Sequence, residues 1–153
     1  MPLNFIVIFQ NVRKYNQYRH TVICTILIHK IIAWHTTETI GEMLGRTGLK
    51  VFRPDMEHFD EKSSQQLKEC YQNSSDSLIE KLKAGWTDET LSAEDDMYGE
   101  KWKRGTTLAV LITHQAHHRG QMTVLMRQAG LIVPGIYGPA KEEWAAYGME
   151  AEK

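Results

Sequence analysis

The longest hydrophobic pattern in the chain runs over residues 20–45 and has the period of an α-helix. Apolar and small side chains recur there every three or four residues, which is typical of a helix that buries one face. Gly45 and Gly48 provide the expected stop. The inward stripe consists of Val22, Ile26, His29, Ala33, Thr36 and Ile40.

Two later segments repeat the helical period. We expect a helix over residues 60–84, with Asp60 as its N-cap, and a clearer one over residues 106–129. Thr106 or Thr107 can cap the latter at its start, and Gly130 can end it. The expected inward faces are Leu67, Tyr71, Ser74, Leu78 and Leu82 in the first helix, and Thr107, Val110, Leu111, His114, His118, Gln121 and Leu125 in the second.

The remaining segments carry weaker patterns. Leu3–Tyr18 fits neither period clearly, and residues 86–105 are expected to form a long connection with short helical turns. After Gly130 we expect a tail with a short amphipathic piece around Trp144–Tyr147, which packs back as a cover. Strand signals are scarce, so the predicted fold class is all-α, a four-helix bundle forming a single domain over residues 1–153.

Composition narrows the possible partners and compartment. A formal net charge of −1, with basic residues interspersed among acidic ones, argues against nucleic acid or an anionic membrane as a partner. The apolar run Leu3–Phe9 is too short to span a bilayer and lacks the features of a signal peptide. Cys24 and Cys70 form no metal-binding spacing and suit a reducing cytosol. We therefore expect a cytoplasmic protein.

The candidate chemistry lies in the cluster His114-Gln115-Ala116-His117-His118. Residues four apart on a helix project from one face, so His114 and His118 can offer two imidazole nitrogens to one metal ion. His117 is rotated about 60° to the other side of His114 and is a poorer candidate. The alternative, exposed or core-edge histidines without a metal, is common for this spacing alone.

A third imidazole is expected from His29, which lies in the apolar stripe of the first predicted helix. Inward histidines need hydrogen-bond partners or a shared ion, because burying a bare polar group costs several kcal/mol. A core histidine bonded to a backbone carbonyl is the competing interpretation. His20, His35 and His58 have no special context and are expected at the surface or behind the ligands.

The late helix also resembles a known family. Its segment LITHQAHHRGQMTVLMRQAG, with Pro134 and Trp144 beyond it, is similar to the DinB/YfiT-like family of four-helix metalloproteins, in which a late helix carries H-x-x-x-H-[RQ]-G-Q. The residues that match this motif are His114, His118, Arg119, Gly120 and Gln121, and the looser early match is Ile26-Leu27-Ile28-His29 with Trp34. The resemblance spans about Ile26–Trp144.

The resemblance implies an up-and-down bundle, a three-histidine site for nickel or zinc, a homodimer, and thiol-dependent transferase or isomerase activity with a low-molecular-weight thiol. Members usually have a longer segment before the first ligand histidine, whereas 28 residues precede His29 here. We therefore expect a short or atypical N-terminal helix, a first helix continuous with the second, or a bundle completed by a neighbouring subunit.

Three neutral imidazoles leave an open coordination position, which favours a catalytic metal that activates water or a thiol. Gln121, one turn beyond His118, can orient an imidazole behind the metal, and Arg119 is expected to face solvent or an anion. We expect a metal-dependent transferase or hydrolase that acts on a small molecule. The alternatives are a non-catalytic bundle with a structural or incidental metal, a stress-response protein without enzymatic activity, and, less favoured, a heme protein.

Overall fold

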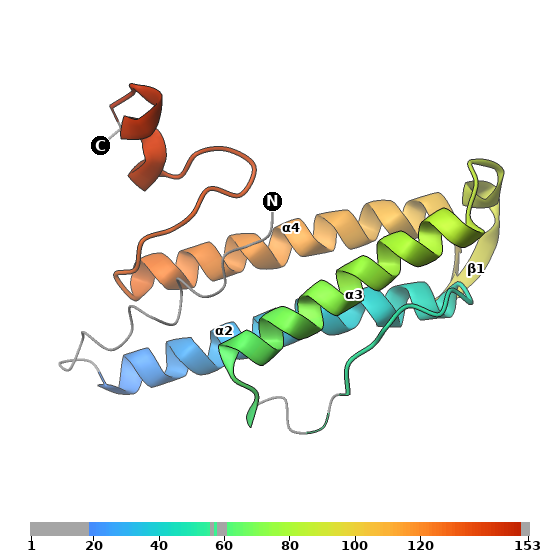
Figure 1. The fold of residues 1–153 in the computed structure, drawn as a ribbon, viewed down its shortest axis with the longest axis horizontal. Coiled ribbons are helices and arrows are strands. Elements are labelled where there is room, and N and C mark those ends of the chain that lie inside the picture. The colour runs from blue at the N-terminus through green and yellow to red at the C-terminus, as the bar shows by residue number, and fades with distance from the viewer. Residues whose placement is uncertain (1–18, 56, 58–60, 151–153) are drawn as a thin grey trace.

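Three long α-helices form the body of the protein (Figure 1). The computed structural model describes residues 19–55, 57 and 61–150, with the backbone alone over 19–26. The helices are α2 (Arg19–Arg46), α3 (Ser64–Gly85) and α4 (Arg104–Gln128). The prediction of an all-α fold is confirmed. The expectations for Leu3–Tyr18 and for a short N-terminal helix lie outside the described residues.

The predicted helix ends were close, but two caps differ from the prediction. Ser63, rather than Asp60, caps α3: its hydroxyl accepts from the backbone N–H of Gln66, and the Gln66 side chain accepts from the backbone N–H of Ser63. This reciprocal capping box satisfies two N–H groups that would otherwise lack partners. Helix α4 begins at Arg104, before Thr106 and Thr107, because a β-strand leads directly into it.

That strand belongs to a hairpin that the sequence did not predict. Beyond the short 3₁₀ helix η3 (Glu89–Ser92), strands β1 (Glu94–Met97) and β2 (Glu100–Lys103) pair antiparallel. Tyr98 and Gly99 form the two-residue turn, with φ angles of 59° and 87°. Positive φ at both positions is the type I′ geometry that suits the twist of a hairpin. The hairpin caps one end of the bundle (Figure 1).

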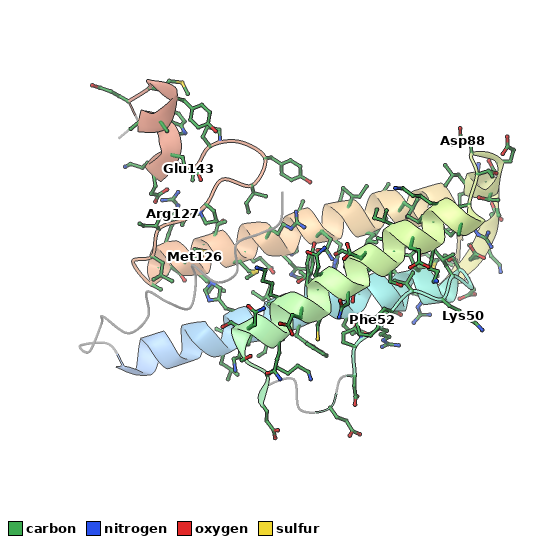
Figure 2. All side chains as sticks on the ribbon, in the orientation of Figure 1. Lys50, Phe52, Asp88, Met126, Arg127 and Glu143 are labelled. Atoms are coloured by element: carbon green, nitrogen blue, oxygen red, sulfur yellow. The ribbon has the colours of Figure 1, made fainter. Side chains whose placement is uncertain are left out.

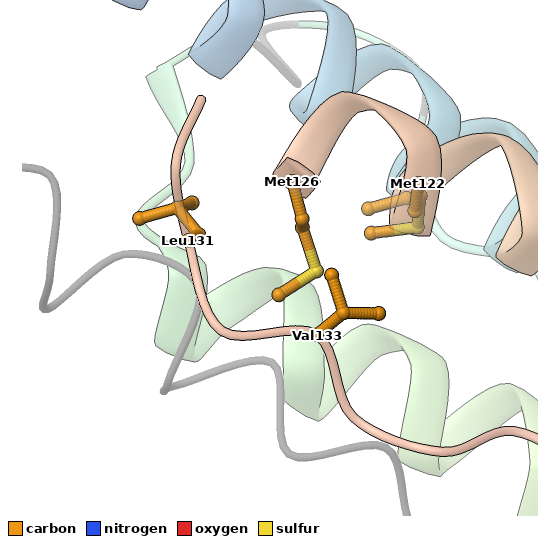
Figure 3. Close-up of a cluster of buried hydrophobic side chains, with 5 residues drawn as sticks. Met122, Met126, Leu131 and Val133 are labelled. Atoms are coloured by element: carbon orange, nitrogen blue, oxygen red, sulfur yellow. The ribbon is translucent and has the colours of Figure 1, made fainter. Parts of the chain in front are cut away.

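The core consists of two apolar clusters with a polar layer between them. One cluster, toward the end of α4, holds Ala33, Met122, Met126, Leu131 and Val133 (Figure 3), and the other, near the hairpin, holds Ile40, Met43, Leu44, Met97 and Leu111. Between them, Gln115 of α4 donates through Nε2 to the backbone carbonyl of Thr36 on α2, at 2.6 Å. This buried bond satisfies two polar groups and fixes the helices against each other.

The inward face of α4 is rotated from the one that the sequence predicted. The buried residues of α4 are Thr107, Leu111, Gln115, Met122 and Met126. His114 and His118 are only partly buried, and Gln121 is exposed. The two histidines therefore lie at the flank of the buried face, beside the seam between α2 and α4. In α2 the predicted stripe is buried from His29 to Ile40, while the side chains of Val22 and Ile26 lie outside the description.

The tail packs back onto the bundle at its beginning and again at Ala140, which lies against the same apolar cluster. Gly130 has a positive φ of 70° and turns the chain, after which Leu131 and Val133 are buried against α4 (Figure 3). Farther on, the 3₁₀ helix η4 (Lys141–Tyr147) stands apart from the three long helices (Figure 1). An Arg127–Glu142 ion pair ties it to α4, and Figure 2 shows Arg127 at this junction. None of the helices described is long and apolar enough to cross a membrane.

Candidate metal centre

Helices α2 and α4 are antiparallel, and their register decides which histidines meet. The Nε2 atom of His29 lies 3.2 Å from the carbonyl oxygen of Met122, and Gln115 bonds to Thr36. From His29 to Thr36 is seven residues along α2, and from Met122 back to Gln115 is seven along α4. The segment of α2 opposite His114 and His118 is therefore the turn around His35.

Three imidazole rings converge at this point of the seam. Nε2 of His114 lies 3.1 Å from Nε2 of His118 and 3.1 Å from Nε2 of His35. One nitrogen from each of these three rings lies within 4.8 Å of the others. The ring centroids are 4.4–4.9 Å apart, with edge-to-face orientations. Two helices thus present three nitrogen donors to one small volume.

The electrostatics of the cluster favour neutral rings. Burial, followed by the charges that His118, His35 and His117 would carry, lowers the pKa of His114 to about 4. Burial is also the main cause that lowers the pKa of His118. Both rings are therefore unprotonated at neutral pH, which is the state in which an imidazole nitrogen binds a metal.

Gln121 fixes the orientation of the His118 ring. Its Oε1 atom lies 2.7 Å from Nδ1 of His118. Because an amide oxygen can only accept, Nδ1 carries the proton and Nε2 keeps its lone pair, directed toward His114. This is the arrangement in which a second side chain sets the tautomer of a metal ligand. The predicted contact of Gln121 with an imidazole is thus present.

The donor set fits a divalent transition metal. Bonds of 2.0–2.1 Å from a tetrahedral ion to nitrogen imply nitrogens about 3.3 Å apart, close to the two 3.1 Å separations in the cluster. Neutral rings cannot satisfy three converging Nε2 atoms among themselves, since His114 can donate from Nε2 to one neighbour only. Nδ1 of His114 is buried and has no hydrogen-bond partner among the described residues. A cation would be bound by all three Nε2 lone pairs at once.

The structure brings His114 and His118 together as predicted, but the third ring is His35 and not His29. His29 is buried, only 2% exposed, and its Nε2 faces the carbonyl of Met122, as in the competing interpretation of a core histidine. His35, expected to be peripheral, is exposed yet contacts both other rings. His117 contacts His118 edge to face and stays outside the group of three. The His20 side chain and His58 lie outside the described residues.

The comparisons with known proteins agree with this architecture. The model of the DinB family matches residues 25–153. The uncharacterized protein YrdA of Bacillus subtilis (strain 168) is 49% identical over 122 residues, covering 80% of this chain and 73% of that protein. The crystal structure of a DinB-like protein from Bacillus cereus matches with a TM-score of 0.62 and 40% identity, over 69% of this chain and 71% of that one. The chain belongs to the DinB family.

Proposed function

We propose that the protein binds one divalent transition metal, nickel or zinc, through Nε2 of His35, His114 and His118, and acts as a metal-dependent enzyme on a small molecule. The observation that carries this proposal is the convergence of three imidazole nitrogens from two helices within 4.8 Å. The chain's membership of the DinB family also supports the proposal, because resemblance to this family implied a metal site.

The composition of the group supports a catalytic site over a structural one. Among the described residues, no thiolate or carboxylate joins the three imidazoles, so the chain supplies three ligands where a closed structural zinc site has four. His35 is exposed, which leaves this side of the cluster accessible to solvent and to a substrate. When bound, a metal in such a site lowers the pKa of a coordinated water or thiol and polarises an electrophile.

The role of the protein's own residues is to hold the metal and to orient the imidazole rings that bind it. The low pKa of His114 keeps its nitrogen free of a proton down to acidic pH, and Gln121 holds the His118 ring in one tautomer. A thiol-dependent transfer or a hydrolysis suits these residues, since neither needs a further general base from the chain. A low-molecular-weight thiol as co-substrate and a homodimer as the assembly remain part of this proposal.

Metal content tests the site directly. We would purify the chain without an affinity tag or chelating column, load it with zinc or nickel, and measure bound metal by mass spectrometry. We expect about one ion per chain, and a loss of at least tenfold in affinity for His35→Ala and for His114→Ala/His118→Ala. His117→Ala is the matched control, because His117 lies outside the group, and it should retain the ion. Equal, sub-stoichiometric metal in all four proteins would contradict the site.

Activity requires a separate assay. The metal-loaded protein would be screened with electrophilic acceptors in the presence and absence of small thiols. We expect turnover that His35→Ala abolishes and His117→Ala preserves. Stoichiometric metal without turnover, together with a lower melting temperature on metal removal, would instead favour the alternative of a non-catalytic bundle with a structural metal.

A further inference from the structure

A pocket lies on the other flank of α4, away from the histidine cluster. Its cavity volume is about 200 Å³, and α2, α3 and α4 all contribute to its wall. The wall is apolar where Ile40, Leu78 and Leu111 meet. Its polar part consists of Tyr71, Ser75, Gln115 and Arg119, and Tyr137 of the tail also lines it. The pocket therefore combines an apolar floor with a small, concentrated polar edge, which is the usual composition of a small-molecule site.

The polar edge is an ordered chain of hydrogen bonds. Nη2 of Arg119 donates to the hydroxyl of Tyr71 at 2.6 Å, and that hydroxyl lies 3.4 Å from Oε1 of Gln115. The other end of the Gln115 amide is held by the backbone of α2. Arg119 is thus fixed at the pocket, while a guanidinium has five N–H donors and only one of them is engaged by Tyr71.

Arg119 differs from the other arginines that the structure describes in the partner of its guanidinium. The structure describes the side chains of five arginines, and four of these pair with a carboxylate: Arg46, Arg53, Arg104 and Arg127. Within the described part of the chain, Arg119 has Tyr71 as its partner and no carboxylate. A half-buried guanidinium beside an apolar cavity, without an acidic neighbour, is suited to an anion that comes from outside the chain.

We propose that this pocket binds a small monocarboxylate with a short apolar body. The single guanidinium matches one carboxylate in a bidentate pair, whereas a phosphate dianion would leave charge uncompensated. The apolar floor can bury the hydrocarbon body of the ligand, which favours binding. A volume of about 200 Å³ lies below the range of drug-sized sites, so the ligand has a short chain.

The pocket is distinct from the metal centre, and carboxylate binding there would be a property additional to the proposed function. Arg119 directly follows His118, and its side chain leaves α4 about 100° around the helix from that of His118 and about 140° from that of His114. The buried Gln115 lies between the two flanks and bonds to α2. A carboxylate held by Arg119 therefore does not reach the three imidazoles, and its binding should not depend on a metal.

The test uses sodium hexanoate with the full-length, metal-free, ¹⁵N-labelled protein, followed by nuclear magnetic resonance. We expect saturable shifts of the Gln115 side-chain amide with a dissociation constant of about 1 mM or tighter. Hexan-1-ol, which has the same body and no charge, should bind at least about tenfold more weakly. Arg119→Gln should weaken hexanoate binding by a similar factor, while Lys101→Gln, an equal loss of charge on the exposed hairpin, should leave it unchanged.

A second variant covers the case in which Arg119→Gln fails to fold. Ser75→Phe places a ring in the same cavity and should abolish binding of both hexanoate and hexan-1-ol. Zinc loading should change the hexanoate affinity by less than twofold. Equal binding of hexanoate and hexan-1-ol would overturn the assignment of a carboxylate site. Hexanoate binding that appears only with zinc, or that survives Ser75→Phe, would overturn the location, while leaving the metal proposal to its own test.

Discussion

Nδ1 of His118 and Oε1 of Gln121 lie 2.7 Å apart, less than one turn along α4. Gln121 does not belong to the three-imidazole group. Through this bond it nevertheless determines which nitrogen of His118 is available to bind a metal there. The affinity of the centre for a metal should therefore depend on a side chain that never touches the ion.

Gln121→Ala is expected to weaken zinc binding by about 10–100-fold, the usual effect of losing a residue that orients a ligand histidine. The reason is that the ring of His118 then samples both tautomers and more than one orientation. Competition with a chromophoric chelator measures the change. Gln121→Glu keeps an acceptor at the same place and should retain most of the affinity. Equal affinities for the wild type and Gln121→Ala would show that the bond has no role.

His35→Ala and His29→Ala should separate the ligand from the core residue. His35 is exposed, so its loss should remove metal binding and change the free energy of unfolding by less than about 0.5 kcal/mol. His29 is buried, so its truncation leaves a cavity that should cost roughly 2–4 kcal/mol with the metal site intact. Urea denaturation of both variants gives the free energy of unfolding, and competition with a chelator gives the metal affinity. The reverse pattern would restore His29 as the third ligand.

The metal-free protein should lose stability on mild acidification. The pKa of His114 is about 4 in the folded chain, lowered first by burial and then by its histidine neighbours, against an ordinary value of 6.5. Because the unfolded chain binds this proton more readily, the free energy of unfolding is highest above pH 6.5 and falls as the pH drops toward 4. His118 contributes in the same direction.

Urea midpoints of the metal-free protein at several pH values from 7.5 to 4.5 test this dependence. His114→Gln, which cannot titrate, should flatten the curve over this range. A midpoint that rises on acidification would mean that the histidine cluster gains, rather than loses, from protonation.

The sequence correctly placed two of the three clustered imidazoles together because their spacing is a property of one helix. His114 and His118 are four residues apart, so any helix over this segment places both side chains on one face. The choice of the third depended on the register between two helices, which periodicity within either helix does not contain. His29 had the stronger apolar context and was expected as the third ligand, but the structure places it against the carbonyl of Met122 and not beside His114 and His118. The antiparallel pairing of Thr36 with Gln115 selects His35.

The hairpin was missed for a related reason. Strand β1 consists of Glu94, Asp95, Asp96 and Met97, which shows no apolar alternation, and four-residue strands are short for a pattern of period two. Residues outside the two strands tie the hairpin to the helices on either side of it. The hydroxyl of Tyr98 donates to Glu42 of α2 at 2.6 Å, and Arg104 pairs with Asp95 at 2.9 Å. Only the Tyr98-Gly99 turn left a local signal.

Two glycines of α2 should respond in opposite ways to alanine. A Cβ atom on Gly41 would lie 2.7 Å from Cβ of Arg53 and 3.0 Å from the carbonyl oxygen of Phe52, so the loop after α2 would have to move. We expect Gly41→Ala to lower the free energy of unfolding by about 1–3 kcal/mol. At Gly45 nothing lies within 4 Å, and Gly45→Ala should raise it by up to about 1 kcal/mol because alanine favours the helix. Urea unfolding of both variants in the metal-free protein measures the difference. If both variants were stabilised, the loop at Phe52 and Arg53 would not be packed against Gly41, and the ion pair between Arg53 and Glu38 would not hold it there.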